Sequence, residues 1–276
     1  MFGKLGLGLG LGGGTSNPIP DTAPEMSFGA NSTNAFNLAW QGQPTSGDIN
    51  TLVNGGYLSF TGTITAEYSS GNWRFTITSG AKIVVKQFRK LKILYIHSYT
   101  QCTWVYNKAM PKTLTDLYLN GNTIYWTYTG ALPAGLTFVD LYGSNIKWIW
   151  NGNLPTGLTY LYLFGTNIRW DYEGALPTGL SRLYLSGDNI RWTYEGALPT
   201  GLSDRLYLSG ANINWTGWGV QASFSFNAKV LISTTYYINI GNSPASEAET
   251  ANFLSKIDAV ALDCASNPQT LTFKKT

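Results

Sequence analysis

A 22-residue repeat is the feature of this sequence that most constrains its fold. A Leu-Pro pair, Met-Pro in the first unit, recurs at constant spacing at Met110-Pro111, Leu132-Pro133, Leu154-Pro155, Leu176-Pro177 and Leu198-Pro199. The unit that begins at Leu154 and the unit that begins at Leu176 are nearly identical. Units of this length bury their apolar residues by stacking on one another, so the repeat predicts a solenoid.

Each unit contains two alternating apolar segments. In Leu158-x-x-Leu161-x-Leu163, Leu161 and Leu163 flank Tyr162, as in a short strand with one buried and one exposed face. The segment from Ile168 to Tyr172 alternates again and predicts an opposite wall with Ile, Trp and Tyr turned inward. Corners are expected at glycines, namely Gly157, Gly165 and Gly174. Stacked units therefore predict parallel strands.

Two further positions recur in register along the repeat. An asparagine lies at Asn145, Asn167, Asn189 and Asn212, with Thr123 as the exception. Its amide is expected to satisfy backbone groups where the chain turns inside the coil. A tryptophan column is expected to pack in the core, and comprises Trp104, Trp126, Trp148, Trp170, Trp192 and Trp215.

The repeat resembles the leucine-rich-repeat family over about residues 110–215. Leu158-x-x-Leu161-x-Leu163 matches the LxxLxL half of the family pattern, although Asn167 follows one residue after the usual asparagine slot, which Thr166 holds. A one-residue insertion near Asp204-Arg205 is another departure, and the segment from Leu91 to Cys102 looks like an earlier, degenerate turn. The resemblance implies a mainly β fold, a leucine-rich-repeat-like solenoid with a parallel sheet.

The rest of the chain divides around this solenoid, which we expect to span 91–242. Residues 1–25 form an extended Gly/Leu-rich arm and a Pro-rich linker, and 26–90 form a small β region or solenoid N-cap. Strands are expected over 35–40, 57–66, 72–78 and 81–86, joined as hairpins, and after the repeat over 224–232 and 236–240. Residues 243–276 form a C-terminal helix–strand cap, with the helix over 243–264 and the strand over 269–275.

Composition argues against several functional classes. Only 12% of residues are charged, 14% are aromatic and the net charge is +3, which is too small for a nucleic-acid binder. No apolar run is long enough for a membrane-spanning helix. His97 is the only histidine, Cys102 and Cys264 stand apart, and Asp171 and Glu173 are not repeated as a pair. We therefore expect no catalytic residues, no metal site and no cofactor.

The outward positions of the repeat predict a recognition face. Tyr is prominent among the residues between and beside the strand leucines, and rigid aromatic rings suit protein or glycan recognition. A tyrosine ladder can equally stabilise a sheet without binding anything, and that alternative stays open. The candidate face comprises Tyr118, Phe138, Asp140, Tyr142, Tyr160, Tyr162, Phe164, Arg182, Tyr184 and Tyr207.

The N-terminal arm suggests where the protein acts. Leu-Gly alternation needs a partner to become ordered, because glycine loses much conformational entropy. Met-Phe-Gly-Lys followed by this alternation resembles the N-terminal segment of some bacteriophage virion proteins. The resemblance implies anchoring to other virion proteins through Phe2, Leu5, Leu7, Leu9 and Leu11.

The sequence thus predicts a non-enzymatic virion structural protein. It is placed on the particle exterior, in a tail or head fibre, and displays its repeat face to a host surface protein or glycan. Two alternatives remain, a bacterial secreted or surface leucine-rich-repeat adhesin and a purely structural capsid or tail decoration protein.

Overall fold

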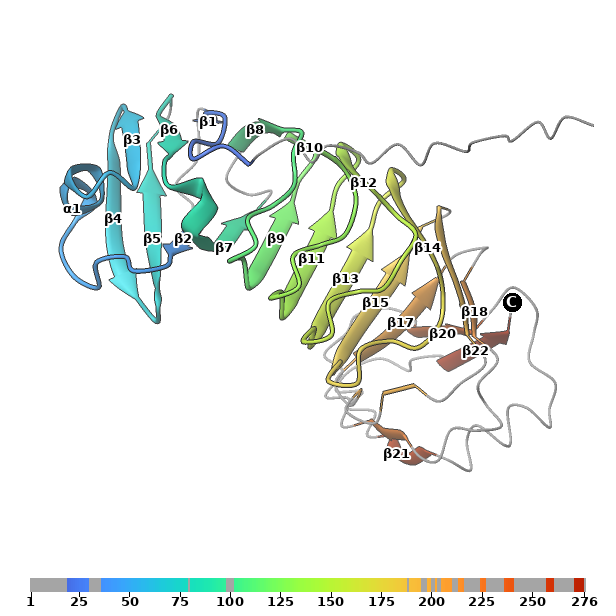
Figure 1. Cartoon of the computed structure of the whole chain (residues 1–276). Helices are drawn as coiled ribbons and strands as arrows, with labels where there is room; N and C mark the ends of the chain where they lie inside the picture. The colour runs from blue at the N-terminus through green and yellow to red at the C-terminus, as the bar shows by residue number, and fades with distance from the viewer. Residues whose placement is uncertain are drawn as a thin grey trace, which may run out of the picture.

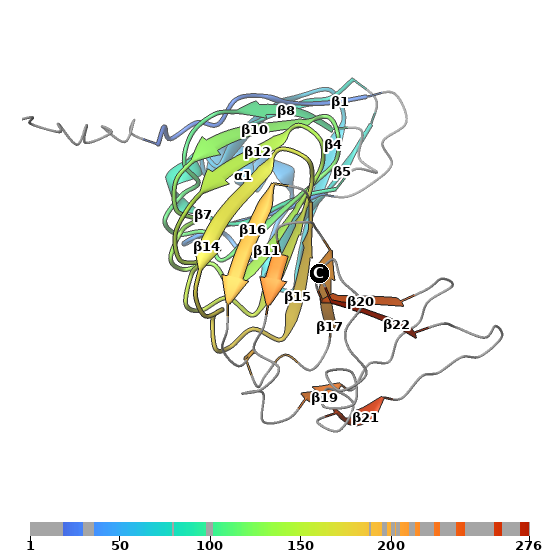
Figure 2. The same cartoon turned by 90° about the vertical axis from the view of Figure 1, so that its right-hand side faces the viewer.

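The computed structural model describes residues 19–29, 36–78, 80–97, 102–187, 189–194, 198–199 and 202, and beyond them the backbones of six strands. Within this part the chain forms a β-solenoid whose coils follow the 22-residue spacing. Figure 1 shows the coils side by side, and Figure 2 looks along the stack at its two walls. The repeat solenoid predicted from the sequence is confirmed at this level.

One wall, the tyrosine sheet, has nine strands in the order β17-β15-β13-β11-β9-β7-β2-β5-β4. Neighbours from β7 to β17 are parallel. From β9 to β15 each residue pairs with its counterpart 22 positions later, as in Phe138 to Tyr160, and the offset is 23 from β7 to β9 and from β15 to β17. The strands are β2 (Phe36–Trp40), β4 (Ile64–Ser69), β5 (Asn72–Ile77), β7 (Leu91–Ile96), β9 (Asp116–Asn120), β11 (Phe138–Tyr142), β13 (Tyr160–Phe164), β15 (Arg182–Ser186) and β17 (Arg205–Ser209).

The opposite wall, the tryptophan sheet, also has nine strands, in the order β18-β16-β14-β12-β10-β8-β1-β6-β3. Its parallel register differs, because Trp148 pairs with Ile168, so neighbouring strands slide by two residues relative to the repeat. The strands are β1 (Met26–Phe28), β3 (Leu58–Thr61), β6 (Lys82–Val85), β8 (Cys102–Tyr106), β10 (Ile124–Thr129), β12 (Ile146–Trp150), β14 (Ile168–Glu173), β16 (Ile190–Tyr194) and β18 (Ile213–Trp215).

The core between the two walls consists of the predicted columns. Leu158, Leu161 and Leu163 are fully buried, and Trp148 and Trp170 are buried opposite them. Trp126, Trp148, Trp170 and Trp192 of this column also donate their indole N–H to a carbonyl 18 residues earlier, at 2.8 to 3.1 Å. The Trp column therefore both fills the core and ties each coil to the preceding one.

The recurring asparagines form a second link between coils. Asn189 donates its side-chain N–H to the carbonyl of Thr166 at 2.6 Å, and Asn167 bonds the carbonyl of Ser144 in the same way. Thr123 takes this role with its hydroxyl, which donates to the carbonyl of Cys102. The expected backbone bonding is confirmed, but Asn167 and Asn189 are exposed and bond to the preceding coil at the surface.

The region before the repeats continues both sheets. β1 joins the tryptophan sheet through antiparallel pairing with β6 and β8, and β2 joins the tyrosine sheet between β5 and β7. A short helix α1 (Ile49–Asn54), capped by the Asp48 side chain, and a 3-10 turn η1 (Phe88–Lys90) complete it. Of the helices in the described residues, none has both the length and the apolar character needed to cross a membrane.

Two expectations for this region need correction. The single strand expected over 57–66 is two strands, because the chain turns at Gly62 (φ 84°), where a Cβ would approach the Ala81 Cα to 2.9 Å. β3 and β4 therefore lie in different sheets. β4 and β5 do form a hairpin, but β5 and β6 do not, since β6 pairs with β3 and β1.

At the C-terminal end the structure describes two further pairs of parallel strands. β19 (Phe224–Phe226) pairs with β21 (Ile257–Val260), and β20 (Tyr236–Ile240) pairs with β22 (Leu271–Lys275). β22 lies where a final strand was expected. The helix expected over 243–264 is wrong at Ile257–Val260, where β-branched residues pair as a strand, and its remainder lies outside the described residues.

Candidate functional site

The outer side of the tyrosine sheet brings the predicted face together. Strand pairing aligns its residues in three columns, and the term tyrosine face is used here for the outward residues of β9, β11, β13 and β15. The three columns are Asp116–Phe138–Tyr160–Arg182, Tyr118–Asp140–Tyr162–Tyr184 and Asn120–Tyr142–Phe164–Ser186. Arg205, Tyr207 and Ser209 continue them on β17 by backbone register.

The rings of the tyrosine face stack face to face along the columns. Phe138 and Tyr160 stack with centroids 4.2 Å apart, and Tyr142 and Phe164 with centroids 4.8 Å apart. Arg182 lies over the Tyr160 ring, with its guanidinium carbon 5.7 Å from the centroid. Because stacked rings cover one another's faces, the outer surface of these columns presents mainly ring edges.

The central column is interrupted at Asp140. Tyr95 and Tyr118 stack at 4.0 Å on one side of it, and Tyr162 and Tyr184 stack at 4.1 Å on the other. Along its own strand Asp140 is flanked by Phe138 and Tyr142, whose ring centroids lie 6.2 Å from that of Tyr118 and 6.5 Å from that of Tyr162. Four aromatic side chains therefore surround a single carboxyl group.

This environment buries the carboxyl group without pairing it. Asp140 is only 5% exposed, and its Oδ1 has no hydrogen-bond partner in the described part of the chain. The phenol groups beside it are engaged elsewhere, since Tyr95 bonds Tyr118 and Tyr162 bonds Tyr184 through their hydroxyls. Burial raises the pKa of Asp140 to about 7, because the ionised form loses its hydration.

The same burial acts on the neighbouring phenols. Desolvation raises the pKa of Tyr162 to about 12, and the nearby Asp140 carboxylate adds to the rise. The pKa of Tyr118 is raised for the same two reasons, with burial again the larger. These phenols stay neutral throughout the range in which Asp140 titrates.

Asp140 belongs to the coil that departs most from its neighbours. Coils that start at Leu154 and Leu176 place Tyr162 and Tyr184 at the position of Asp140, and the preceding coil places Tyr118 there. The same coil, 132–153, also carries Trp150 in place of Tyr172. Sequence reasoning placed Asp140 on the face but missed its burial, and this departure from the repeat was the available signal.

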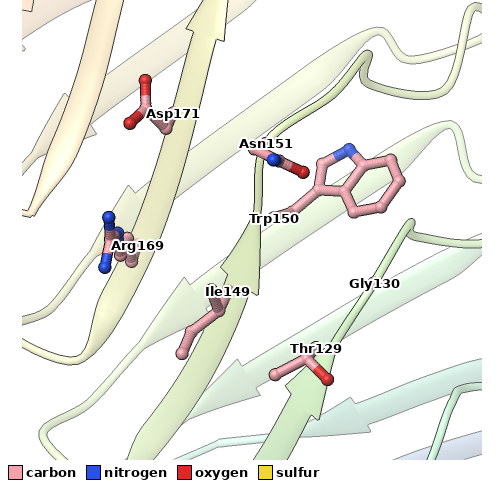
Figure 3. Close-up of a pocket in the computed structure, with 7 residues that line it drawn as sticks. All are labelled: Thr129, Gly130, Ile149, Trp150, Asn151, Arg169 and Asp171. Atoms are coloured by element: carbon pink, nitrogen blue, oxygen red, sulfur yellow. The ribbon is translucent and has the colours of Figure 1, made fainter. Parts of the chain in front are cut away.

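A second feature of this coil is a groove on the tryptophan sheet, with a volume of about 490 Å³. Figure 3 shows Arg169 and Asp171 on one strand, with Ile149 and Trp150 on the next and Asn151 just after that strand ends. Trp150 keeps a structural bond, as its indole N–H donates to the carbonyl of Asn153 at 3.1 Å. Thr129 and Gly130 complete the lining, so the groove is lined by both apolar and polar residues.

The surroundings of the remaining candidate residues do not favour catalytic chemistry. His97 stacks against Tyr118, with ring centroids 5.5 Å apart, and burial lowers its pKa. Cys102 is a buried free thiol whose pKa burial raises to about 12, which opposes thiolate chemistry. Asp171 lines the groove and Glu173 is exposed. No cluster of three His, Cys, Asp or Glu side chains suited to a metal occurs among the residues the structure describes.

Several predicted residues cannot be placed in a site. Phe2, Leu5, Leu7, Leu9 and Leu11 lie outside the described residues. For Tyr207 the structure gives the strand but no side-chain surroundings, and Cys264 also falls outside the description.

The chain was compared with protein-family models, curated proteins and solved structures. Neither a protein-family model, nor a curated protein, nor a solved structure matches this chain.

Proposed function

We propose that this protein is a non-enzymatic binding protein of a bacteriophage particle and that the tyrosine face is its recognition surface. The observation that carries the proposal is Asp140. A buried carboxyl group without a partner costs free energy, whereas a Tyr there would continue the column. A costly residue in the middle of an outward aromatic face is typical of a binding site.

The aromatic composition supports the same function. Phe138, Tyr142, Tyr160, Tyr162 and Phe164 are all half-buried, so each keeps contact area available to a partner. Stacking holds the rings in place, and a partner therefore pays little conformational entropy to order them.

The phage assignment rests on the arm and is separate from the recognition assignment. The Leu-Gly alternation over 5–11 would dock as a strand against other virion proteins, with Phe2 as an added apolar contact. Kinship with leucine-rich-repeat proteins is part of the same proposal. A bacterial leucine-rich-repeat adhesin remains the runner-up, because it would use the same face without a virion anchor.

The recognition function is tested by replacing Tyr160, Tyr162 and Phe164, all on β13, with Ser. We expect adsorption to the host bacterium to fall about ten-fold or more, because loss of aromatic anchors typically costs over 1 kcal/mol each. The matched control replaces the exposed Val105 (56%) and Tyr125 (44%) of the tryptophan sheet with Ser, and should leave adsorption unchanged. Unchanged adsorption with a lower melting temperature would instead support a purely structural decoration protein.

The anchoring function is tested by deleting residues 2–14. Particles should then fail to incorporate the protein, while the solenoid stays folded in solution. Normal incorporation would show that the arm is not the anchor.

A further inference from the structure

The interruption of the central column places one carboxyl group between two stacked pairs of tyrosines. Tyr118 stacks on Tyr95 with one face, and Tyr162 stacks on Tyr184 with one face. Asp140 lies between them on β11, where its strand neighbours cover it, since Phe138 stacks on Tyr118 with centroids 6.2 Å apart and Tyr142 is tilted against Tyr162 at 6.5 Å. Two strand spacings, about 9.6 Å, separate the backbones that carry these rings. This spacing admits one planar group between the two rings once Phe138 and Tyr142 turn aside.

The groups around Asp140 favour the binding of a positively charged group. The face of an aromatic ring carries negative electrostatic potential and attracts cations. The ionised Asp140 carboxylate accepts hydrogen bonds and donates none. A ligand group that fits must therefore be cationic, rich in N–H donors and flat. A guanidinium group has all three properties and stacks readily on aromatic faces.

We propose that the tyrosine face binds a protein partner through an arginine side chain, whose guanidinium enters between Tyr118 and Tyr162 and donates hydrogen bonds to Asp140. This deepens the proposed recognition function and rests on it. The partner is a protein, because an arginine side chain supplies the group that both the rings and the carboxylate require.

A partner reaches this carboxyl group by displacing the rings that cover it, because Asp140 is only 5% exposed. Asp140 sits on the outer side of the sheet, and the side chains around it, namely Tyr118, Phe138, Tyr142 and Tyr162, are themselves half-buried. The proposal therefore requires the side chains around Asp140 to rotate aside when the partner binds. The Arg182 side chain of the face lies over Tyr160, two strands from Asp140, and so leaves this carboxylate to the partner.

The test is an NMR titration of the full-length protein with a blocked arginine, and with a blocked citrulline as the matched neutral probe. Citrulline keeps the length and planarity of arginine but carries no charge. We expect arginine to shift the ring signals of Tyr118 and Tyr162, and citrulline to bind at least about ten-fold more weakly. N-acetylglucosamine serves as a carbohydrate probe.

Variants connect the binding to Asp140. Asp140→Asn removes the charge at constant size, and Asp140→Tyr restores the residue of the neighbouring coils. Both should weaken arginine binding at least about ten-fold. Asp171→Asn removes a carboxylate from the other sheet and should leave it unchanged.

Each other outcome overturns the inference. Absence of arginine binding by the folded protein, equal binding of citrulline, or unchanged binding by Asp140→Asn would each contradict it. Binding of the carbohydrate that persists in Asp140→Asn would contradict the arginine site yet keep the recognition function. Loss of host adsorption in the β13 variant would likewise keep that function even if arginine fails to bind.

Discussion

At the scale of single residues, Asp140 is where the chain departs most clearly from what packing favours. Its outward neighbours are aromatic, and its carboxyl group is buried with one oxygen unpaired. The other four coils of the repeat have Tyr at this position, which shows what packing alone favours. We therefore expect Asp140 to lower the stability of the free protein.

The first prediction concerns the pH dependence of that effect. The Asp140 pKa rises from 3.8 to about 7 on folding, so the folded state holds a proton that the unfolded state releases. Stability should fall as pH rises from about 4 to about 7 and then level off. The facing groups are Tyr95 from β7, Tyr118 from β9 and Tyr162 from β13, whose pKa values are all raised, so none of them titrates in this window.

Asp140→Asn isolates this contribution. The variant lacks the titrating group, so its advantage in free energy of unfolding over the natural protein should grow across this window, up to about 4 kcal/mol. Urea unfolding at pH 4, 5.5, 7 and 8.5 measures it. An advantage that is independent of pH would show that burial does not perturb this carboxyl group.

A second residue-scale prediction concerns the close approach of consecutive coils at Gly143. A Cβ there would lie 2.5 Å from the carbonyl oxygen of Gly121 in the preceding coil. Gly143→Ala should therefore destabilise the protein by about 1–3 kcal/mol. Gly157→Ala is the control, since its Cβ would meet its nearest atom at 3.9 Å. Equal unfolding midpoints for the two variants would contradict the close approach.

At the scale of elements, each coil is held to the preceding one by tryptophan side chains as well as by backbone pairing within the tryptophan sheet. The Trp170 indole N–H bonds the carbonyl of Gly152 at 3.1 Å, whereas the Trp104 indole N–H has no partner among the described residues. Trp170→Phe should cost about 2–4 kcal/mol, from lost volume and an unpaired carbonyl. Trp104→Phe should cost less, because it removes an unpaired donor. Equal decreases in the free energy of unfolding for Trp170→Phe and Trp104→Phe, measured by thermal unfolding, would contradict a stabilising role of the Trp170 hydrogen bond.

The elements also show how far the sequence predicts the fold. Leu161 and Leu163 define their strand without ambiguity, because alternation within a unit and repetition between units agree. The segment 57–66 has only alternation, and nothing in it marks the switch between sheets at Gly62. Ile257 and Val260 fit a helical stripe equally well, and their pairing with β19 is a long-range contact that local pattern does not encode.

The candidate site, too, is only partly predictable from the sequence. Outward placement of Tyr118, Tyr162 and Tyr184 follows from the spacing, and the strand register confirms it. The burial of Asp140 does not follow, because it depends on how Phe138 and Tyr142 lean across the columns.

At the scale of the whole molecule, stability should be a sum over coils and their interfaces. Deleting residues 154–175 removes one complete coil and lets β11 pair with β15 in the same register. This variant should unfold cooperatively at a lower temperature. Deleting 154–164 removes β13 from the tyrosine sheet but keeps β14 in the tryptophan sheet. The strands of the two walls then no longer match, and the chain should not fold. Similar melting curves for both deletions would contradict a solenoid built from 22-residue coils.

The central claim is that the tyrosine face is the contact surface of this molecule, and hydroxyl-radical footprinting on host cells tests it most directly. In the bound state, oxidation of Phe138, Tyr142, Tyr160 and Tyr162 should fall relative to the free protein, while that of Tyr125 on the opposite wall stays unchanged. Protection of Tyr125 with an unprotected tyrosine face would contradict the claim.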